Sequence, residues 1–206
     1  MGIEELAGNT IYDGNFDPAD AKQVFIAFLN GSGRNGISNV IEWLEKSDFY
    51  SCPASSRYHG ACRYGLLKHS LAVYYNMMKI RNALDPSLTL VSDDGIAVTA
   101  LLHDLAKVGF YVESTRNVKN NDTGQWEKVP YYAIEDQMPI GHSEKSIIIL
   151  LKLGLALSDN EIKCLRSHMG GWEPGAEHIV GGCWKDNPLG PMLHMADMAA
   201  VYIDKL

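Results

Sequence analysis

The sequence predicts an all-α, single-domain fold with one small β-hairpin inserted after a central helix. Apolar residues recur at every third or fourth position in several segments, and this spacing places them on one face of a helix. Capping residues, prolines and glycines separate these segments. Two β-leaning segments within residues 110–134 flank a turn-rich connection. With 206 residues, 46% of them hydrophobic, the chain can bury one sizeable core. We therefore expect residues 1–206 to form one domain.

The first fifty residues predict two helices. Asp17 and Pro18 supply a capping residue and a proline in the first turn of the first helix. Residues 31–36 form a glycine-rich turn, but they match no phosphate-binding loop and follow a helix, so we expect a plain connection. The segment 37–44 repeats apolar residues at helical spacing and predicts the second helix.

The middle of the chain predicts a loop, a long helix, the central helix and the hairpin. Residues 49–65 show no clear period, and the helix over 66–84 ends next to a proline. The central helix is expected to run from residue 92 or 93 to about residue 109. In the hairpin, residues 110–118 and 125–134 are the expected strands.

Three further helices complete the prediction. They start at Gly141, at the capping box Ser158-Asp-Asn-Glu161 and at Pro191, and the last one is expected to run to Leu206. Residues 172–188 are expected to be irregular.

Charge and cysteine spacing limit the class of protein. The formal net charge of −7 argues against the broad basic surface that long nucleic acids need, although a local cluster can still bind a small phosphate-bearing substrate. No apolar run approaches the roughly 20 residues of a membrane span, and the N-terminus lacks the basic and then apolar order of a signal peptide. We therefore expect a cytoplasmic protein without a membrane partner. The four cysteines have no C-x-x-C spacing and are expected to be reduced thiols.

Two adjacent polar residues, His103 and Asp104, interrupt the apolar run of the central helix. Burial of an imidazole next to a carboxylate is costly unless both groups are paired, and a divalent metal ion pairs with both. Lys107 follows three and four residues later, so it shares their face of the helix. A cation beside a metal ion indicates an anionic substrate.

Polar residues that interrupt the predicted helices follow the order H, HD, H, H, D. They are His69, His103, Asp104, His142, His168 and Asp197. This order, with the local phrases Gly65-Leu-Leu-Lys-His69 and Leu101-Leu-His-Asp-Leu-Ala-Lys107, resembles the HD-domain metal-dependent phosphohydrolase superfamily.

The resemblance covers roughly residues 58–204 and implies an HD-domain helical bundle. In that fold, residues 1–50 would be an N-terminal helical extension and residues 110–134 a hairpin insertion. Residues 39–49 and 116–119 are also similar to compact HD proteins of bacterial mobile elements and prophages, a likeness that brings no assigned substrate.

By this resemblance we expect a binuclear centre of divalent metal ions. The candidate metals are Mn, Fe, Co, Ni, Zn and Mg, because the expected ligands are imidazoles and carboxylates and include no thiolate. The first ion would be held by His69, His103, Asp104 and Asp197. His142 and His168 would hold the second ion, with Asp104 bridging the two. A hydroxide shared between ions roughly 3.5–4 Å apart is the expected nucleophile, and Lys107 would neutralise charge on the phosphoryl oxygens. A single ion is the alternative.

Basic residues before the first ligand are candidates for substrate binding. Arg57, His59 and Arg63 lie in the loop that precedes His69, where they either grip a phosphate or form a solvated basic segment. His194 lies one turn before Asp197 and either orients a ligand or is an ordinary helix residue.

One further histidine and the aromatic residues of the hairpin are expected to have no direct role in the site. His178 is expected at the surface. The aromatic residues of the hairpin are expected to pack the ribbon onto the core, with stacking on a base as the alternative. They are Tyr111, Trp126, Tyr131 and Tyr132.

The resemblance implies hydrolysis of a phosphoester in a nucleotide or short oligonucleotide. Its nucleotidase branch often places an acidic residue shortly after the HD pair, where this chain has Lys107, so a phosphodiesterase is favoured. The order is also similar to the HD portion of bacterial 3′-to-5′ exoribonucleases, but those carry a further nucleic-acid-binding domain, so a small substrate is expected. The alternatives are an HD-type di-iron oxygenase and a non-catalytic protein that sequesters a nucleotide.

Overall fold

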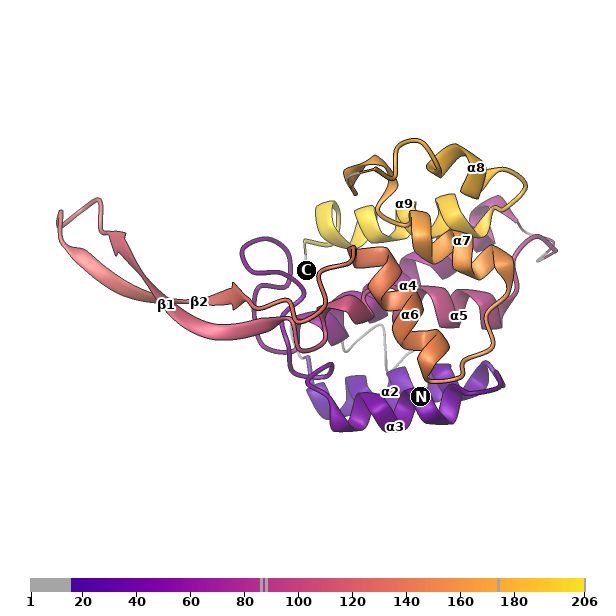
Figure 1. Cartoon of the computed structure of the whole chain (residues 1–206), viewed down its shortest axis with the longest axis horizontal. Helices are drawn as coiled ribbons and strands as arrows, with labels where there is room; N and C mark the ends of the chain where they lie inside the picture. Colours follow the sequence, from indigo (N-terminus) through magenta and orange to yellow (C-terminus); the bar gives the residue numbers. More distant parts are fainter. Residues whose placement is uncertain (1–15, 86, 88, 174, 206) are drawn as a thin grey trace.

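The computed structural model describes residues 16–85, 87, 89–173 and 175–205. The N-terminal residues considered above for a signal peptide lie outside this part. The described elements are α2 (Pro18–Gly31), α3 (Ile37–Lys46), α4 (Gly65–Leu84), α5 (Asp93–Leu102), the 3-10 helix η1 (Leu105–Lys107), β1 (Tyr111–Lys119), β2 (Trp126–Ile134), α6 (His142–Lys152), α7 (Asp159–Ser167), the 3-10 helix η2 (Gly170–Trp172), α8 (Val180–Trp184) and α9 (Leu189–Tyr202). Figure 1 shows the helices gathered in one body and the β1–β2 hairpin projecting from it as an arm.

Helix α4 occupies the centre of the helical body and packs against α2, α5 and α9 (Figure 1). Its residues Leu66, Leu67, Leu71 and Met77 are fully buried. Apolar side chains occur on all sides of this helix, the pattern of a helix surrounded by protein. A polar side chain on α4, such as His69, is therefore held at a defined place in the interior.

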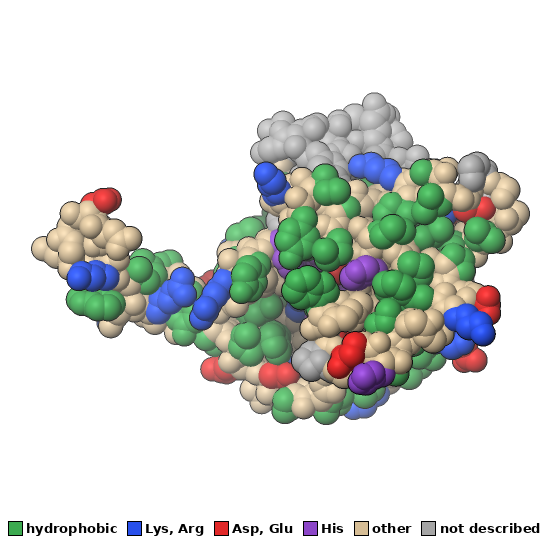
Figure 2. Space-filling view, turned by 90° about the horizontal axis from the view of Figure 1, so that it is seen from above, with side chains coloured by type: hydrophobic (Ala, Val, Ile, Leu, Met, Phe, Trp, Pro, Cys, Tyr) green, Lys and Arg blue, Asp and Glu red, His purple; other side chains and the backbone are tan. Residues whose placement is uncertain are grey.

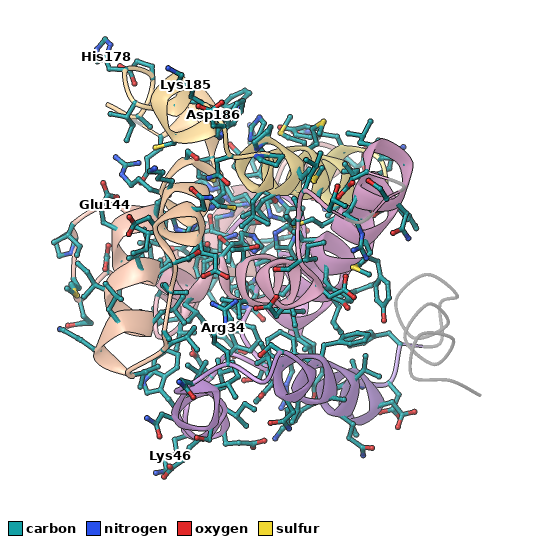
Figure 3. The ribbon with its side chains drawn as sticks, turned by 90° about the vertical axis from the view of Figure 1, so that its right-hand side faces the viewer. Arg34, Lys46, Glu144, His178, Lys185 and Asp186 are labelled. Carbon is teal, nitrogen blue, oxygen red and sulfur yellow. The ribbon has the colours of Figure 1, made fainter. Side chains whose placement is uncertain are left out.

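The glycine-rich turn between α2 and α3 is fixed in place, and it is more than the plain connection expected. The guanidinium of Arg34 donates to both carboxylate oxygens of Glu161, at 2.8 and 2.7 Å, and also pairs with Asp94. Hydrogen bonds to Glu161 raise the pKa of Arg34. Gly36 has a φ of 88°, and a Cβ there would come within 2.2 Å of the Gly154 carbonyl oxygen. Figure 3 shows Arg34 directed from this turn toward the body.

The central helix is shorter than the sequence predicts. Helix α5 ends at Leu102, and a separate 3-10 turn follows the His103-Asp104 pair. The expectation of one helix to about residue 109 is wrong because the backbone amide of Ala106 donates to the Ser146 hydroxyl, 2.9 Å away on α6, outside any helical ladder. The break lies at the two residues that carry the chemistry.

The hairpin is confirmed. Strands β1 and β2 pair in antiparallel register from Tyr111 opposite Ile134 to Lys119 opposite Trp126. The Asn120 side chain accepts the backbone amide of Asp122 at 2.9 Å and forms the turn. Most of the arm is exposed to solvent, so its paired backbone, and no layer of core residues, defines its shape.

The C-terminal elements differ from the prediction in two respects. The capping box at Ser158 and Glu161 is present, but the segment expected to be irregular contains the short helix α8. Helix α9 begins at Leu189 and ends at Tyr202, a little earlier at both ends than expected. All four cysteines are free thiols, as expected. None of the described helices combines the length and apolar content that a membrane span requires.

Candidate metal centre and adjoining pocket

Six side chains from five parts of the chain meet in the interior at α4. His69 comes from α4, His103 and Asp104 from the break after α5, His142 from the start of α6, His168 from the end of α7, and Asp197 from α9. Four of them are at most 2% exposed, namely His69, His103, Asp104 and His168. The six residues expected to ligate metal thus lie in one cluster.

Asp104 lies at the middle of the cluster, and its two oxygens face different histidines. Oδ2 lies 3.4 Å from Nε2 of His69 and 3.2 Å from Nε2 of His103. Oδ1 lies 2.7 Å from Nε2 of His142 and 3.9 Å from Nε2 of His168. One carboxylate that serves two pairs of imidazoles is the arrangement that a ligand shared by two ions requires.

Asp197 completes the side of the cluster that contains Oδ2 of Asp104. Its Oδ1 lies 3.2 Å from Nε2 of His69. Two groups of residues have ligand atoms within 4.8 Å of one another, close enough to hold an ion: His69, His103 and Asp197, and His103, Asp104 and His168. The donor set of imidazoles and carboxylates suits a divalent transition metal or magnesium.

Backbone carbonyls orient two of the histidines. Nδ1 of His103 donates to the Ala100 carbonyl at 2.9 Å, and Nδ1 of His168 donates to the Leu165 carbonyl at 2.7 Å. With a proton on Nδ1, each ring can present its Nε2 to a metal ion in the cluster, as metal-binding histidines require. Nε2 of His168 is buried and makes no hydrogen bond to any described residue. A buried nitrogen without a partner in this position fits a metal ligand.

Charges in the cluster favour metal binding at neutral pH. Burial would raise the pKa of Asp104, but the charges of His103 and Lys107 hold it well below its usual range. Burial would likewise raise the pKa of Asp197, but the hydrogen bond from His69 lowers it. Burial lowers the pKa of His168 to about 4, and nearby histidines contribute. Both carboxylates are therefore charged and His168 is neutral.

His69 differs from His168 in the direction of its pKa shift. Burial would lower its pKa, but hydrogen bonds to Asp104 and Asp197 outweigh burial and raise it. A metal ion therefore competes with a proton at this histidine more directly than at His168.

Lys107 and His194 support the cluster from outside. Nζ of Lys107 lies 2.6 Å from Oδ2 of Asp104. Nδ1 of His194 donates to the backbone carbonyl of His168 at 2.7 Å, and its ring lies against Trp184 with centroids 5.4 Å apart. Of the two readings of His194, the contact with a neighbouring candidate ligand favours the orienting one.

The cluster opens into a cavity of about 830 Å³. Asp104, Lys107, His142 and Asp197 lie at its polar end. The rest of its lining is mainly aromatic and apolar: Tyr58, Met169, Trp172, Met198, Val201 and Tyr202, with His59, His194 and Lys205. Tyr58, Trp172 and Tyr202 are 82%, 70% and 63% exposed, so their rings are accessible to a ligand. Figure 2 shows histidine side chains among apolar side chains on one face of the body.

Sequence reasoning missed the aromatic wall of this cavity. A signal was present on α9, because residues 197, 198, 201 and 202 recur at helical spacing after the candidate His194. The sequence around Tyr58 and Trp172 gives no such signal, because only the tertiary fold brings these two residues to the cavity.

The loop residues expected to bind substrate are divided between two cavities. His59 lines the metal cavity, with its ring 4.9 Å from that of His69, and burial lowers its pKa to about 4. Arg57 and Arg63 line a second groove next to the hairpin. The structure therefore does not bring these two arginines to the metal cluster.

The remaining candidates are placed as follows. His178 is 86% exposed, as expected for a surface residue. Tyr111 is partly buried at the base of the arm, where burial raises its pKa, and Tyr131 and Tyr132 line the second groove. Trp126 is 70% exposed near the tip of the arm, so the expectation that it packs onto the core is wrong.

Comparison with known families agrees with this geometry. A family model described as HD domain matches residues 66–193. The match covers more than half of the chain, and the chain belongs to the HD-domain phosphohydrolase superfamily, whose domains bind divalent metals. Five of the six clustered residues fall within the match, and Asp197 lies just beyond its end. A search of curated proteins found no match. A search of solved structures found none either.

Proposed function

We propose that the protein is a metal-dependent phosphodiesterase that acts on a nucleotide or short oligonucleotide. One observation carries this proposal: the His/Asp cluster, a lysine and accessible aromatic rings line the same cavity. The cluster suits a phosphoryl group and the rings suit a base. A cavity of about 830 Å³ is within the range of pockets that enclose a small ligand.

The residues present fit two divalent ions with Asp104 shared. His69, His103 and Asp197 would complete the site on the Oδ2 side of Asp104, and His142 and His168 the site on the Oδ1 side. When bound, such ions supply Lewis-acid polarisation of phosphoryl oxygens and an activated water.

The other polar side chains of the cavity position the substrate. Lys107 holds a positive charge next to Asp104, where it stabilises the negative charge that develops on a phosphoryl oxygen during displacement. His59 is neutral at pH 7 because burial lowers its pKa to about 4. It can therefore donate a hydrogen bond to a phosphate without adding charge.

The aromatic side chains support a nucleotide over a simple phosphate. Tyr58, Trp172 and Tyr202 expose their rings in the same cavity, and base stacking on such rings contributes about 1–3 kcal/mol per base. A lysine after the HD pair, where the nucleotidase branch often has an acid, favours a diester over a monoester.

A metal analysis followed by a substrate screen tests the proposal. Protein purified without chelator is analysed for metals. It is then assayed with bis(4-nitrophenyl) phosphate, 4-nitrophenyl phosphate and short oligonucleotides in the presence of Mn, Ni, Co or Mg. We expect about two ions per chain and a preference for diesters. Iron together with oxygen consumption and no phosphate release would instead identify an oxygenase, and nucleotide binding without turnover would identify a sequestering protein.

A further inference from the structure

We infer that the groove between the loop 56–63 and the base of the hairpin binds the phosphate backbone of a short single-stranded nucleic acid. The scissile bond of the same strand would lie in the metal cavity, so the inference rests on the proposed phosphodiesterase function. The groove has a volume of about 750 Å³. Arg57 and Arg63 line it from the loop, and Arg116, Tyr131 and Tyr132 line it from the arm.

The distribution of arginines sets this groove apart from the rest of the molecule. The chain has six arginines. Three form ion pairs with carboxylates: Arg34 with Asp94 and Glu161, Arg81 with Asp93, and Arg166 with Glu144 and Glu173. The other three all line the groove.

The groove arginines are available for an external anion. Arg57, Arg63 and Arg116 form no salt bridge within residues 16–85, 87, 89–173 and 175–205. Arg63 and Arg116 instead lie over aromatic rings, those of Tyr64 at 5.0 Å and Tyr131 at 5.6 Å. In a chain with a net charge of −7, three such arginines in one groove form a local attraction for phosphate. Figure 2 shows Lys and Arg side chains spaced along the arm up to the point where it meets the body.

The chemistry of the groove matches a nucleic acid strand better than an isolated anion. Guanidinium groups bind phosphates with two parallel hydrogen bonds, and tyrosine rings stack on bases of any identity. Arg116 with Tyr131 places both functions side by side on the arm. The carboxylate of Glu113 also lines the groove and repels phosphate, but it can accept a hydrogen bond from a sugar hydroxyl or a base amino group.

The groove adjoins the metal cavity through consecutive residues of one loop. Arg57 lines the groove, whereas Tyr58 and His59 line the metal cavity. The Cα atoms of Arg57 and His59 are separated by at most about 7 Å, because only two peptide units join them. A strand cut at the metal cluster can therefore reach the arginines within a few nucleotides. Tyr58, which is 82% exposed, stands between the two and offers a ring to an intervening base.

Binding of strands of different length tests the inference without relying on cleavage. The full-length chain is held in chelator so that no strand is cut. Its affinity for fluorescent dT2, dT8 and U8 is then measured by anisotropy. The test variant combines Arg57→Ala, Arg63→Ala and Arg116→Ala. The matched control combines Lys152→Ala, Lys163→Ala and Lys185→Ala, which removes the same charge from exposed positions outside the groove. Figure 3 shows Lys185, which directly follows α8.

We expect the parent chain to bind the octamers more tightly than the dimer. The arginine variant should weaken octamer binding at least about tenfold and leave dimer binding nearly unchanged. It should also reduce the slope of log affinity against log salt concentration by about 2, as expected for three lost phosphate contacts. The lysine control should change octamer affinity less than about twofold. The comparison of dT8 with U8 shows whether DNA or RNA is preferred.

Three results would overturn the groove assignment. The first is equal affinity of the parent chain for dT2 and for the octamers. The second is an equal loss of octamer affinity in the arginine and lysine variants. The third is that the parent protein is a dimer and the arginine variant a monomer, which would make the groove an interface between two copies of the chain. Turnover of bis(4-nitrophenyl) phosphate separates this inference from the proposed function. If octamers bind as expected but nothing is hydrolysed, the groove stands and the phosphodiesterase fails. If the small diester is hydrolysed but the arginine variant binds octamers as well as the parent chain does, the phosphodiesterase stands and the groove assignment fails.

Discussion

The ammonium group of Lys107 lies 2.6 Å from Oδ2 of Asp104, the same oxygen that faces His69 and His103. The 3-10 turn after the HD pair produces this contact, since side chains three residues apart lie on the same side of such a turn. Oδ1 of Asp104 remains turned toward His142 and His168. A fixed positive charge therefore lies at one side of the candidate metal centre, where the cavity opens.

Lys107→Met is expected to lower kcat about a hundredfold while metal content stays the same. The substitution keeps the volume of the side chain but removes the charge that stabilises a phosphoryl oxygen. The measurement is kcat and KM for a diester, with elemental analysis of the same samples. Lys152→Met, at an exposed position, serves as the control. A Lys107→Met enzyme that works at the parent rate would exclude this lysine from the mechanism.

Asp104→Ala is expected to lose bound metal and activity together, with activity reduced more than about a hundredfold. Both of its oxygens face histidines of the cluster. Loss of a group that only supports a metal ligand already lowers metal affinity or activity about 10–100-fold, so loss of a ligand should lower them further. Metal per chain and turnover are measured on one preparation. Asp122→Ala, in the exposed turn of the hairpin, should keep both. Full metal content in Asp104→Ala would contradict the shared-ligand geometry.

Trp172→Ala is expected to raise KM for a nucleotide diester about tenfold or more and to leave kcat within about twofold. Loss of a stacking ring costs about 1–3 kcal/mol, and this ring lines the cavity. Trp126→Ala is a close control, because Trp126 is also 70% exposed but lies on the arm. Equal effects of the two substitutions on KM would argue against an aromatic wall for the base.

Arg34→Ala is expected to lower the free energy of unfolding by about 2–4 kcal/mol. The substitution leaves the buried carboxylate of Glu161 without its two hydrogen bonds from the guanidinium. Thermal or urea unfolding measures the effect. Figure 3 shows Lys46 at the edge of the molecule. Lys46→Ala removes its exposed ion pair with Glu42 and should change stability by less than about 1 kcal/mol. Equal stability of the two variants would contradict the role given to Arg34.

Metal-free protein is expected to lose stability as the pH falls from about 6.5 to about 4. Burial lowers the pKa of His168 from 6.5 to about 4, with help from the charges of His103 and His142. Within this window the unfolded chain binds a proton at His168 and the folded chain does not. The free energy of unfolding therefore decreases with falling pH, by at most about 3 kcal/mol for this group.

Two other histidines modify this pH dependence. Burial also lowers the pKa of His59 to about 4, which adds to the same slope. The raised pKa of His69 acts in the opposite direction, because its contribution is present below pH 6.5 and is lost as the pH rises through the raised value. Urea unfolding in chelator at several pH values measures the slope. His168→Gln should flatten it and the exposed His178→Gln should not. A parent-like slope in His168→Gln would contradict the assignment.

Much of the fold and the identity of the cluster follow from local sequence. The capping box at Ser158, the turn residues at Asn120 and the spacing of apolar residues in α4 each act within four residues or so, so the chain specifies them without tertiary contacts. The order of the six polar residues also predicts which side chains meet, through its resemblance to the HD-domain superfamily.

Only the tertiary structure decides how these elements meet. The break after α5 depends on the Ser146 hydroxyl of another helix, and the orientation of His194 depends on the carbonyl of His168, 26 residues earlier. Arg57 lines a different cavity from His59 because its groove is completed by residues of the distant hairpin arm. The physical reason is the same in each case: these contacts join residues far apart in sequence, and local spacing carries no information about which of them fold together.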